Sequence, residues 1–379
     1  MKKFRDVIFW IHLLCGTFAG VFIFVMCVTG ALIAFEKNII NFAERDMQYV
    51  SPPVAGTQQM ATSEILTKLV SRVPDVKPSG ITIKDNPNAA LVVSTGREGK
   101  FYVNPYTGEI TGTGAKNWEA FFEFNEDLHR RLAFEGDARA YGKWVNDAAN
   151  FLFAILAITG IYIWFPRKLR WKSVRPVIWF KTDSRGKARN FNWHNTIGFW
   201  TSLVLIILTV TGIVISYKWA SDLVYTITGN SAPPRTERRP SNGNDETRAF
   251  SIPANLDQLV LDAKNHGQWK AISLTLPVEK VAQFNVEEGI YWNRFARSTL
   301  TLNAQSGEVE TWKPYSSQNS GQKLRSWIRF THTGESFGLF GQFIAFLACI
   351  GGAFLVWTGF SLALTRFKNW RLRKNMSNA

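Results

Sequence analysis

The sequence predicts a membrane-embedded α-helical protein with four transmembrane helices in two parallel repeats and two extramembrane α+β domains. Three observations lead to this prediction. Four apolar stretches are long enough to cross a hydrocarbon core about 30 Å thick at about 1.5 Å per residue. Polar segments of domain size separate the first stretch from the second and the third from the fourth. Short motifs recur between the two halves at fixed offsets.

These patterns divide the chain into eight segments. Spans are expected at residues 7–35, 144–165, 194–217 and 337–364, with domains at 36–143 and 218–336. A basic loop at 166–193 and a basic tail at 365–379 complete the chain. The first span follows basic residues, as the apolar core of a signal peptide does. It is too long for such a core, and no small-x-small cleavage site follows it. We therefore expect an uncleaved signal anchor.

The net charge of +15 is concentrated in three short segments, which together account for all of it. They are the first six residues, the loop at 167–190 and the tail from Arg366 onward, and each flanks the same side of the spans. The positive-inside rule makes that side cytoplasmic, with both termini inside and both large segments outside. The charge therefore indicates membrane topology rather than nucleic-acid binding.

Both polar segments show one helix followed by strands. In the first, Thr62 or Ser63 is expected to cap the helix, and in the second Asn255 caps a helix that Gly267 ends. The predicted strands are residues 81–84, 91–95 and 101–104, then 271–276, 281–286 and 299–303.

Thr-Gly pairs mark the internal repeat. Thr29-Gly30 recurs in the second half of the chain as Thr211-Gly212, and Thr159-Gly160 recurs at a longer offset as Thr358-Gly359. The change of offset indicates an insertion in the second copy, for which residues 231–247 are the candidate. Because each copy contains two spans, the copies enter the membrane in the same direction, and such repeats are related by an axis along the membrane normal.

Four of the five histidines follow this repeat. His12 and His194 are separated by the same offset as the first two Thr-Gly pairs, and each is followed one turn later by a glycine, Gly16 or Gly198. His129 and His332 each precede a span on the other side. Two symmetry-related imidazoles suit haem iron, whose porphyrin leaves two axial positions. We therefore predict two bis-histidine b-type haems roughly 20 Å apart, with the glycines leaving room for the macrocycle.

Other interpretations of these residues remain open. A lone histidine at a helix end is usually structural, and zinc would need four ligands, which neither pair offers. His266 has no counterpart and is assigned to the surface. Arg130, Arg131 and Arg329 lie beside the second histidine pair and are candidates for haem propionates or lipid headgroups. The three cysteines fall within spans, so no disulfide framework is expected.

The chain resembles the PepSY-associated transmembrane family of bacterial inner-membrane proteins, and within it the FoxB-type ferric-siderophore reductases. The motifs are Trp-x-His-x-x-x-Gly at 10–16, Trp-His-Asn-x-x-Gly at 193–198, Thr-Gly-Ile-Tyr-x-Trp-Phe-Pro at 159–166, and two Asn-x-x-[Thr/Ser]-Gly-Glu turns of PepSY-like domains. The resemblance implies that the two outer segments are periplasmic PepSY-like domains. It also implies that two b haems carry electrons to iron in a periplasmic siderophore complex.

The predicted function is therefore that of an oxidoreductase that reduces a ferric siderophore. The chain has no nicotinamide or flavin signature, so the electrons are expected to come from a quinol, a reduced flavin or a separate reductase. Two alternatives remain. One is a cytochrome b561-like quinol oxidoreductase with another acceptor. The other is a haem-free membrane protein whose PepSY domains bind a periplasmic partner.

Overall fold

The computed structural model describes residues 2–52, 54, 56–96, 99–166, 170–233, 250–290, 293 and 295–377. The chain divides into two compact units, and each is built from both halves of the sequence. The helical unit contains residues 1–36, 120–231 and 324–379, and the sheet unit contains residues 37–119 and 232–323. The candidate insertion at 231–247 lies almost wholly outside the described residues.

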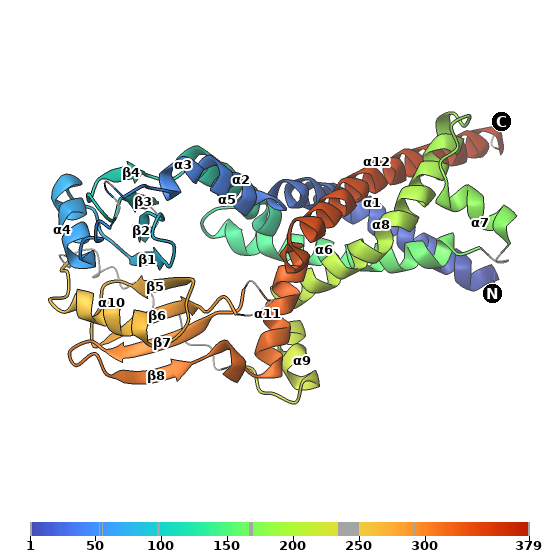
Figure 1. Ribbon diagram of the computed structural model, residues 1–379. Coiled ribbons are helices and arrows are strands. Elements are labelled where there is room, and N and C mark those ends of the chain that lie inside the picture. Colours follow the sequence, from blue (N-terminus) through green and yellow to red (C-terminus); the bar gives the residue numbers. More distant parts are fainter. Residues whose placement is uncertain are drawn as a thin grey trace. The chain divides into compact units, whose positions relative to one another are not determined.

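Four long helices form the centre of the helical unit (Figure 1). They are α1 (Lys2–Ile33), α6 (Ala138–Trp164), α8 (Gly186–Ser216) and α12 (Gly338–Ser377). Both α1 and α8 pack against α6 and α12, so the four helices contact one another in a ring. Among the described residues, the four segments long and apolar enough to cross a membrane each overlap one of these helices, which confirms a membrane helical protein.

Small residues allow the long helices to approach closely. A Cβ added at Gly20 of α1 would lie 2.6 Å from the Phe360 ring of α12, and one at Gly352 would lie 2.6 Å from Cys27 Sγ. Small residues at helix contacts are typical of membrane bundles, where van der Waals packing provides much of the association energy. Cys15, Cys27 and Cys349 are all free thiols.

Four shorter helices accompany the long ones in the helical unit. They are α5 (Lys116–Arg131), α7 (Trp171–Ile178), α9 (Lys218–Ile227) and α11 (Ser320–His332). The first four residues of α5 and of α11 belong to the sheet unit. The sequence analysis did not predict them. It also began the third span at residue 194, whereas α8 begins at Gly186, so the end of the predicted loop is helical. Arg167 and Lys168 of that loop lie outside the described residues.

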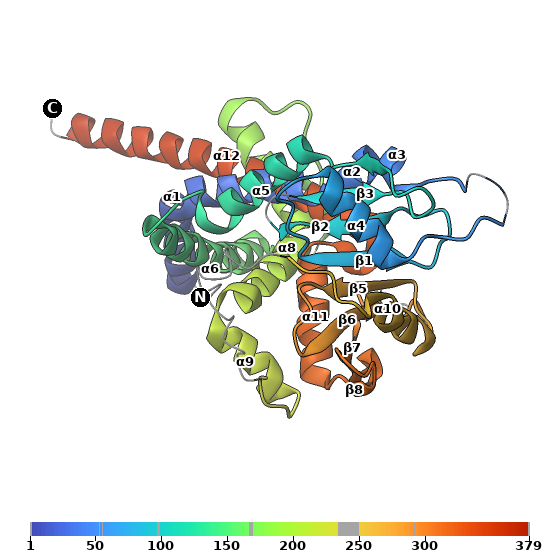
Figure 2. The ribbon, with the colours of Figure 1, turned by 90° about the vertical axis from the view of Figure 1, so that its left-hand side faces the viewer.

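The sheet unit contains one antiparallel sheet of eight described strands. Its order is β4-β3-β2-β1-β5-β6-β7-β8, so the two polar segments share a sheet through the pairing of β1 with β5 (Figure 2). The strands are β1 (Gly80–Lys84), β2 (Leu91–Ser94), β3 (Lys100–Val103), β4 (Ile110–Gly112), β5 (Ala271–Thr275), β6 (Val281–Glu287), β7 (Ser298–Asn303) and β8 (Val309–Lys313). The six predicted strands are confirmed within two residues, whereas β4 and β8 were missed.

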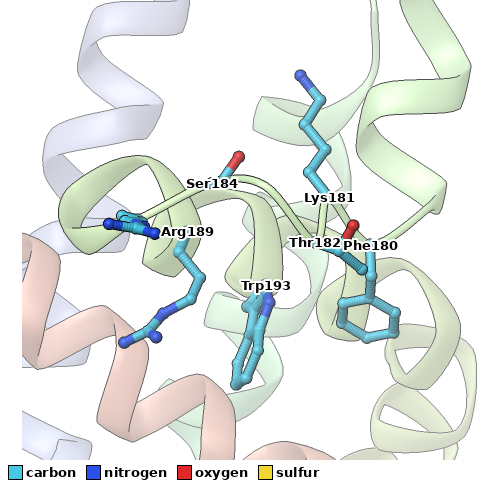
Figure 3. Close-up of a pocket in the computed structure, with 7 residues that line it drawn as sticks. Phe180, Lys181, Thr182, Ser184, Arg189 and Trp193 are labelled. Carbon is cyan, nitrogen blue, oxygen red and sulfur yellow. The ribbon is translucent and has the colours of Figure 1, made fainter.

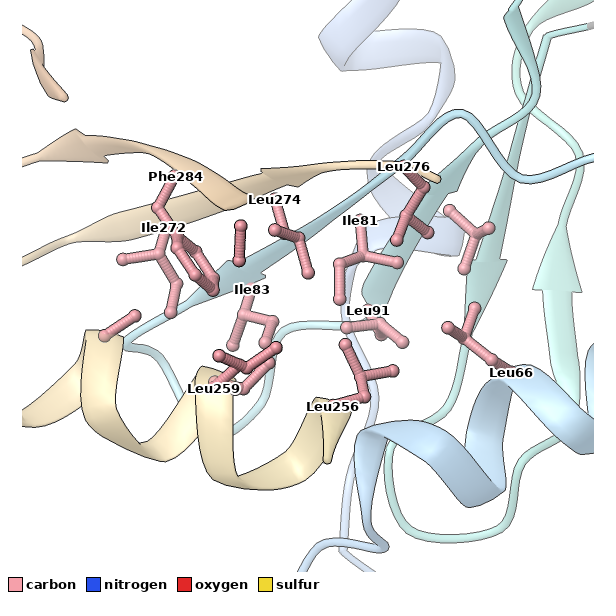
Figure 4. Packing of buried hydrophobic residues seen from close by; sticks show 14 of the residues in the cluster. Leu66, Ile81, Ile83, Leu91, Leu256, Leu259, Ile272, Leu274, Leu276 and Phe284 are labelled. Atoms are coloured by element: carbon pink, nitrogen blue, oxygen red, sulfur yellow. The ribbon is translucent and has the colours of Figure 1, made fainter. Parts of the chain in front are cut away.

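Helices α4 (Thr62–Arg72) and α10 (Leu256–Asn265) contribute the apolar side chains that cover the inner face of the sheet (Figure 4). The alternating strand pattern supplies the other half of this core, for example Ile81 and Leu274, which are paired across β1 and β5. The sheet unit also contains two short helices, α2 (Glu36–Ala43), whose first residue belongs to the helical unit, and α3 (Arg45–Gln48). Two short 3-10 turns lie at Tyr315–Ser317 and Glu335–Phe337.

The predicted helix ends of α4 and α10 need correction. Ala61, not Thr62 or Ser63, is the N-cap of α4, and the Ser63 hydroxyl instead donates to the Asp257 carboxylate of α10. Asn255 is the N-cap of α10 as predicted, but its side-chain amide donates to the Ala304 carbonyl rather than capping the helix. In both cases a tertiary partner replaced the local capping bond.

Candidate functional site

His12 and His194, here called the first pair, lie together in the helical unit. His12 is on α1, and His194 is on α8 about two turns after the helix begins. Their ring centroids are 6.4 Å apart and their planes are perpendicular, at 90°. The two residues are far apart in sequence, so only the packing of α1 and α8 against the same two helices brings them together.

His129 and His332, here called the second pair, show the same separation. His129 lies in the last turn of α5 and His332 ends α11. Their ring centroids are also 6.4 Å apart, with an interplanar angle of 55°. Desolvation and the neighbouring charges of His332 and Arg130 lower the pKa of His129 to about 4, and desolvation also lowers the pKa of His332. Both imidazoles are therefore neutral at pH 7, which is the form that binds a metal.

Each of the four imidazoles contacts a threonine on a long helix. The distances from Nδ1 to Oγ1 are 2.9 Å for His12 with Thr159, 2.9 Å for His194 with Thr358, 2.9 Å for His129 with Thr29 and 3.0 Å for His332 with Thr211. His332 Nδ1 is also 2.9 Å from the Leu208 carbonyl oxygen. These threonines are those of the four Thr-Gly pairs, which the sequence analysis used only as markers of the repeat.

The glycine after each threonine faces the same ring. An added Cβ would lie 3.2–3.5 Å from the histidine Cε1 at all four positions, namely Gly30, Gly160, Gly212 and Gly359. By contrast, the glycines predicted to make room for a cofactor, Gly16 and Gly198, face Leu156 and Leu355 at 3.6 Å. The structure therefore puts four other glycines beside the imidazoles, and repeated Thr-Gly dipeptides were the signal that pointed to them.

The three arginines differ in their surroundings. Arg131 forms an ion pair with Asp127 one turn earlier in α5. Arg130 is exposed and lies 3.9 Å from Glu126, while Arg329 of α11 is exposed. Arg131 and Arg130 are thus both paired within their own helix, Arg131 closely and Arg130 at longer range, while Arg130 and Arg329 are the more exposed of the three.

The spacing of the pairs fits two axial ligands of one metal. With metal–nitrogen bonds of about 2.0–2.1 Å and each ring centroid about 1.1 Å behind its nitrogen, two trans imidazoles have centroids about 6.3 Å apart. Both pairs are at 6.4 Å. Each ring also keeps Nε2 available, because Nδ1 is the atom near threonine. In the described part of the chain, no three His, Cys, Asp or Glu side chains converge as a metal site.

The two pairs are well separated along the bundle. Helix α1 carries both His12 and Thr29, which contacts His129, and α8 carries both His194 and Thr211, which contacts His332, at the same spacing. At about 1.5 Å per residue, both helices put the pairs roughly 25 Å apart. This is somewhat longer than the roughly 20 Å expected from the sequence and close to the thickness of a hydrocarbon core.

A pocket of about 400 Å³ lies at the beginning of α8, next in sequence to the first pair (Figure 3). Its lining residues are Phe180, Lys181, Thr182, Ser184, Arg185, Arg189 and Trp193. The Arg189 guanidinium lies 5.5 Å from the centre of the Trp193 ring, and Phe180 meets that ring edge-on. The pocket is therefore basic and aromatic, and Trp193 directly precedes His194.

His266 is not part of either pair. It is the C-cap of α10 in the sheet unit, where its ring meets Trp312 edge-on at 4.8 Å. The C-cap is thus His266, one residue before the Gly267 that was predicted to end the helix.

Together, the helices and the paired imidazoles define a membrane helical protein with two candidate ligand pairs, separated along the bundle. A model of the family described as the PepSY-associated TM region matches residues 9–366, nearly the whole chain. The chain belongs to this family. No curated protein matches it.

Proposed function

We propose that this protein carries electrons across the bacterial inner membrane through two b-type haems and reduces ferric iron in a siderophore complex on the periplasmic side. The observation that carries the proposal is the presence of two histidine pairs, each at the separation required for trans axial ligands, about 25 Å apart along the bundle. One such pair can arise from packing alone, but two at the same spacing in a ring of four helices favour a repeated ligand site.

In this proposal the first pair and the second pair each hold one b-type haem. Haem iron held in this way would supply a one-electron carrier, and two imidazole ligands would leave it no vacant position for oxygen. The chain's own residues orient the imidazoles, keep them neutral and separate the two sites along the membrane. Arg130, which is exposed and only loosely paired with Glu126, and the exposed Arg329 are the candidates for the propionates of the second site.

The charge distribution and the order of elements support the proposed topology. The basic segments lie at the helix ends near the first pair, so the positive-inside rule makes this pair cytoplasmic and the second pair periplasmic. We also propose two parallel repeats, each ordered as long helix, sheet segment, histidine-bearing helix and long helix. The antiparallel pairing of β1 with β5 in the middle of the sheet fits a two-fold relation between the repeats. The sheet unit, formed from both PepSY-like segments, then lies in the periplasm.

The acceptor is proposed from family likeness, and the donor from the residues of the pocket. Likeness to FoxB-type reductases supports a ferric siderophore, in which reduction weakens the hold of hard oxygen ligands on iron. A quinol, a reduced flavin or a separate reductase would supply the electron. The cations of the pocket beside Trp193 favour an anionic donor, such as a reduced flavin that carries a phosphate.

Haem content and its dependence on the histidines test the proposal. The purified protein is expected to show a Soret band and two haems per chain. His12→Ala and His194→Ala should each remove the same haem, and His129→Ala and His332→Ala should each remove the other. A colourless wild-type protein, or loss of both haems from every variant without loss of the fold, would contradict the assignment and favour the haem-free binding module.

The acceptor needs a separate measurement. Reoxidation of the dithionite-reduced protein by a hydroxamate or catecholate ferric siderophore is followed by stopped-flow absorbance, with a soluble quinone as the comparison. Faster reoxidation by the ferric siderophore supports the proposed activity. Reoxidation by the quinone alone would point instead to the quinol oxidoreductase.

A further inference from the structure

The hydroxyl hydrogens of the four threonines fix the direction of their bonds to histidine. Each threonine donates its single hydroxyl hydrogen to the carbonyl four residues earlier in its own helix. The Oγ1–O distances are 2.7 Å from Thr29 to Val25, 2.6 Å from Thr159 to Ile155, 2.6 Å from Thr211 to Ile207 and 2.8 Å from Thr358 to Phe354. With that hydrogen engaged, each Oγ1 contacts its imidazole as an acceptor.

An accepting Oγ1 requires a hydrogen on the histidine Nδ1. A neutral imidazole carries one ring hydrogen, so Nε2 of all four histidines keeps its lone pair. The metal-ligating tautomer is thus set by the neighbouring helix before any ligand binds. His332 has a second acceptor for the same hydrogen, the Leu208 carbonyl, 2.9 Å from Nδ1.

The glycine that follows each threonine limits the position of the ring. A Cβ at Gly212 or Gly30 would lie 3.2 or 3.3 Å from the histidine Cε1, tighter than ordinary contact, and at Gly160 or Gly359 it would lie 3.4 or 3.5 Å away. Glycine therefore lets the imidazole lie directly against the helix backbone, where it reaches the threonine hydroxyl. The threonine and the glycine of each Thr-Gly dipeptide therefore act on the same imidazole ring. The threonine acts through a hydrogen bond and the glycine through its lack of a side chain.

We propose that the four Thr-Gly pairs are positioning elements that hold the four histidines in the Nδ1-protonated tautomer and orient Nε2 as the axial ligand of haem iron. This inference rests on the proposed function, because it names how the chain prepares the proposed haem ligands. An accepting partner at Nδ1 also makes the imidazole a stronger donor, which stabilises the ferric state.

The test compares Val and Ser variants of two threonines. Thr159 contacts the first histidine pair and Thr29 contacts the second. Thr→Val keeps the shape and removes the acceptor, whereas Thr→Ser keeps the hydroxyl. Thr17→Val is the matched control, because Thr17 makes the same bond to the carbonyl four residues earlier in α1, to Leu13 at 2.8 Å, in an exposed position. The readouts are haem transfer to apomyoglobin, the midpoint potential of each haem and the low-spin ferric EPR spectrum.

We expect Thr159→Val to weaken retention of the first haem by about tenfold to a hundredfold and to raise its midpoint potential, with the second haem unchanged. Thr29→Val should do the same to the second haem alone. Thr→Ser should restore both properties, and Thr17→Val should match the wild type. The inference is overturned if the Val variants match the Thr17 control, or if Ser is as harmful as Val. A wild-type protein without haem would overturn the proposed function as well, so the two failures are distinguishable.

Discussion

Glu44 provides a sharp test of how the sheet unit is held together. Its side chain is 1% exposed and accepts hydrogen bonds at 2.9 Å from Lys100 Nζ, from the Tyr102 hydroxyl and from the Ala115 amide. Lys100 also contacts Glu119 at 3.0 Å. Glu44→Gln keeps the volume of the side chain but removes the charge and turns one acceptor into a donor that faces other donors.

We expect Glu44→Gln to cost roughly 2–3 kcal/mol of unfolding free energy, since a charged hydrogen bond is worth about 1.5–3 kcal/mol and its partners stay buried. For a unit of this size that corresponds to roughly 5–10 °C in Tm. Thermal unfolding of the purified protein, followed by tryptophan fluorescence, measures the change. Glu119→Gln is the control, because Glu119 is more exposed, at 28%, and its loss should cost less than about 1 kcal/mol.

The same carboxylate predicts a dependence on pH. Burial alone would raise the pKa of Glu44, but hydrogen bonds from Lys100, Ala115 and Tyr102 hold it below the usual value of 4.5. A lowered pKa in the folded state stabilises the unit fully above about pH 4.5, and this contribution is lost as the pH falls through the folded value. Wild type should therefore lose stability below about pH 4.5 more steeply than Glu44→Gln. Equal stability of the two proteins at pH 7 would refute the reasoning.

Three further predictions concern the core, the pocket and the histidine planes. Leu259→Ala in α10, a fully buried position, should cost about 2–5 kcal/mol of stability, while Leu261→Ala on the exposed face of the same helix should cost less than about 1 kcal/mol, both measured by thermal unfolding. Arg189→Gln should slow reduction of the protein by reduced flavin mononucleotide but not by dithionite, and Arg175→Gln, in α7 outside the pocket, should change neither rate in stopped-flow absorbance. The first pair, with perpendicular planes, should give a more anisotropic low-spin ferric EPR signal than the second pair, with planes at 55°.

The sequence was most informative where a local period decides the structure. The apolar runs predicted the four long helices because a membrane span needs about 20 such residues. The alternation of apolar and polar residues predicted strands, and these strands bury their apolar side chains, as at Ile81, Val93 and Leu274. The missed strands β4 and β8 are only partly buried and carry little alternation, so their pairing with a neighbour determines them.

The parts that could not be predicted depend on contacts between distant residues. The pairing of β1 with β5 joins strands from opposite halves of the chain, and no pattern within either strand predicts it. The predicted N-cap of α4 was wrong for the same reason, since Ser63 bonds to Asp257 on another helix. At the candidate site the histidines were visible as repeated residues, but the contact of Gly30 with His129 joins residues about a hundred positions apart, and no local pattern predicts it.

Each of the four paired histidines has a threonine contact within its own half of the chain and a histidine contact in the other half. Every contact of a histidine with threonine lies within one half, as in His12 with Thr159 and His129 with Thr29. Both contacts of histidine with histidine lie between the halves. Each half can therefore set the tautomer and orientation of its two imidazoles by itself, and packing the halves together then creates both ligand pairs at once. The proposed two-repeat arrangement would account for the equal 6.4 Å separation of the two pairs, because each repeat contributes one histidine to each pair.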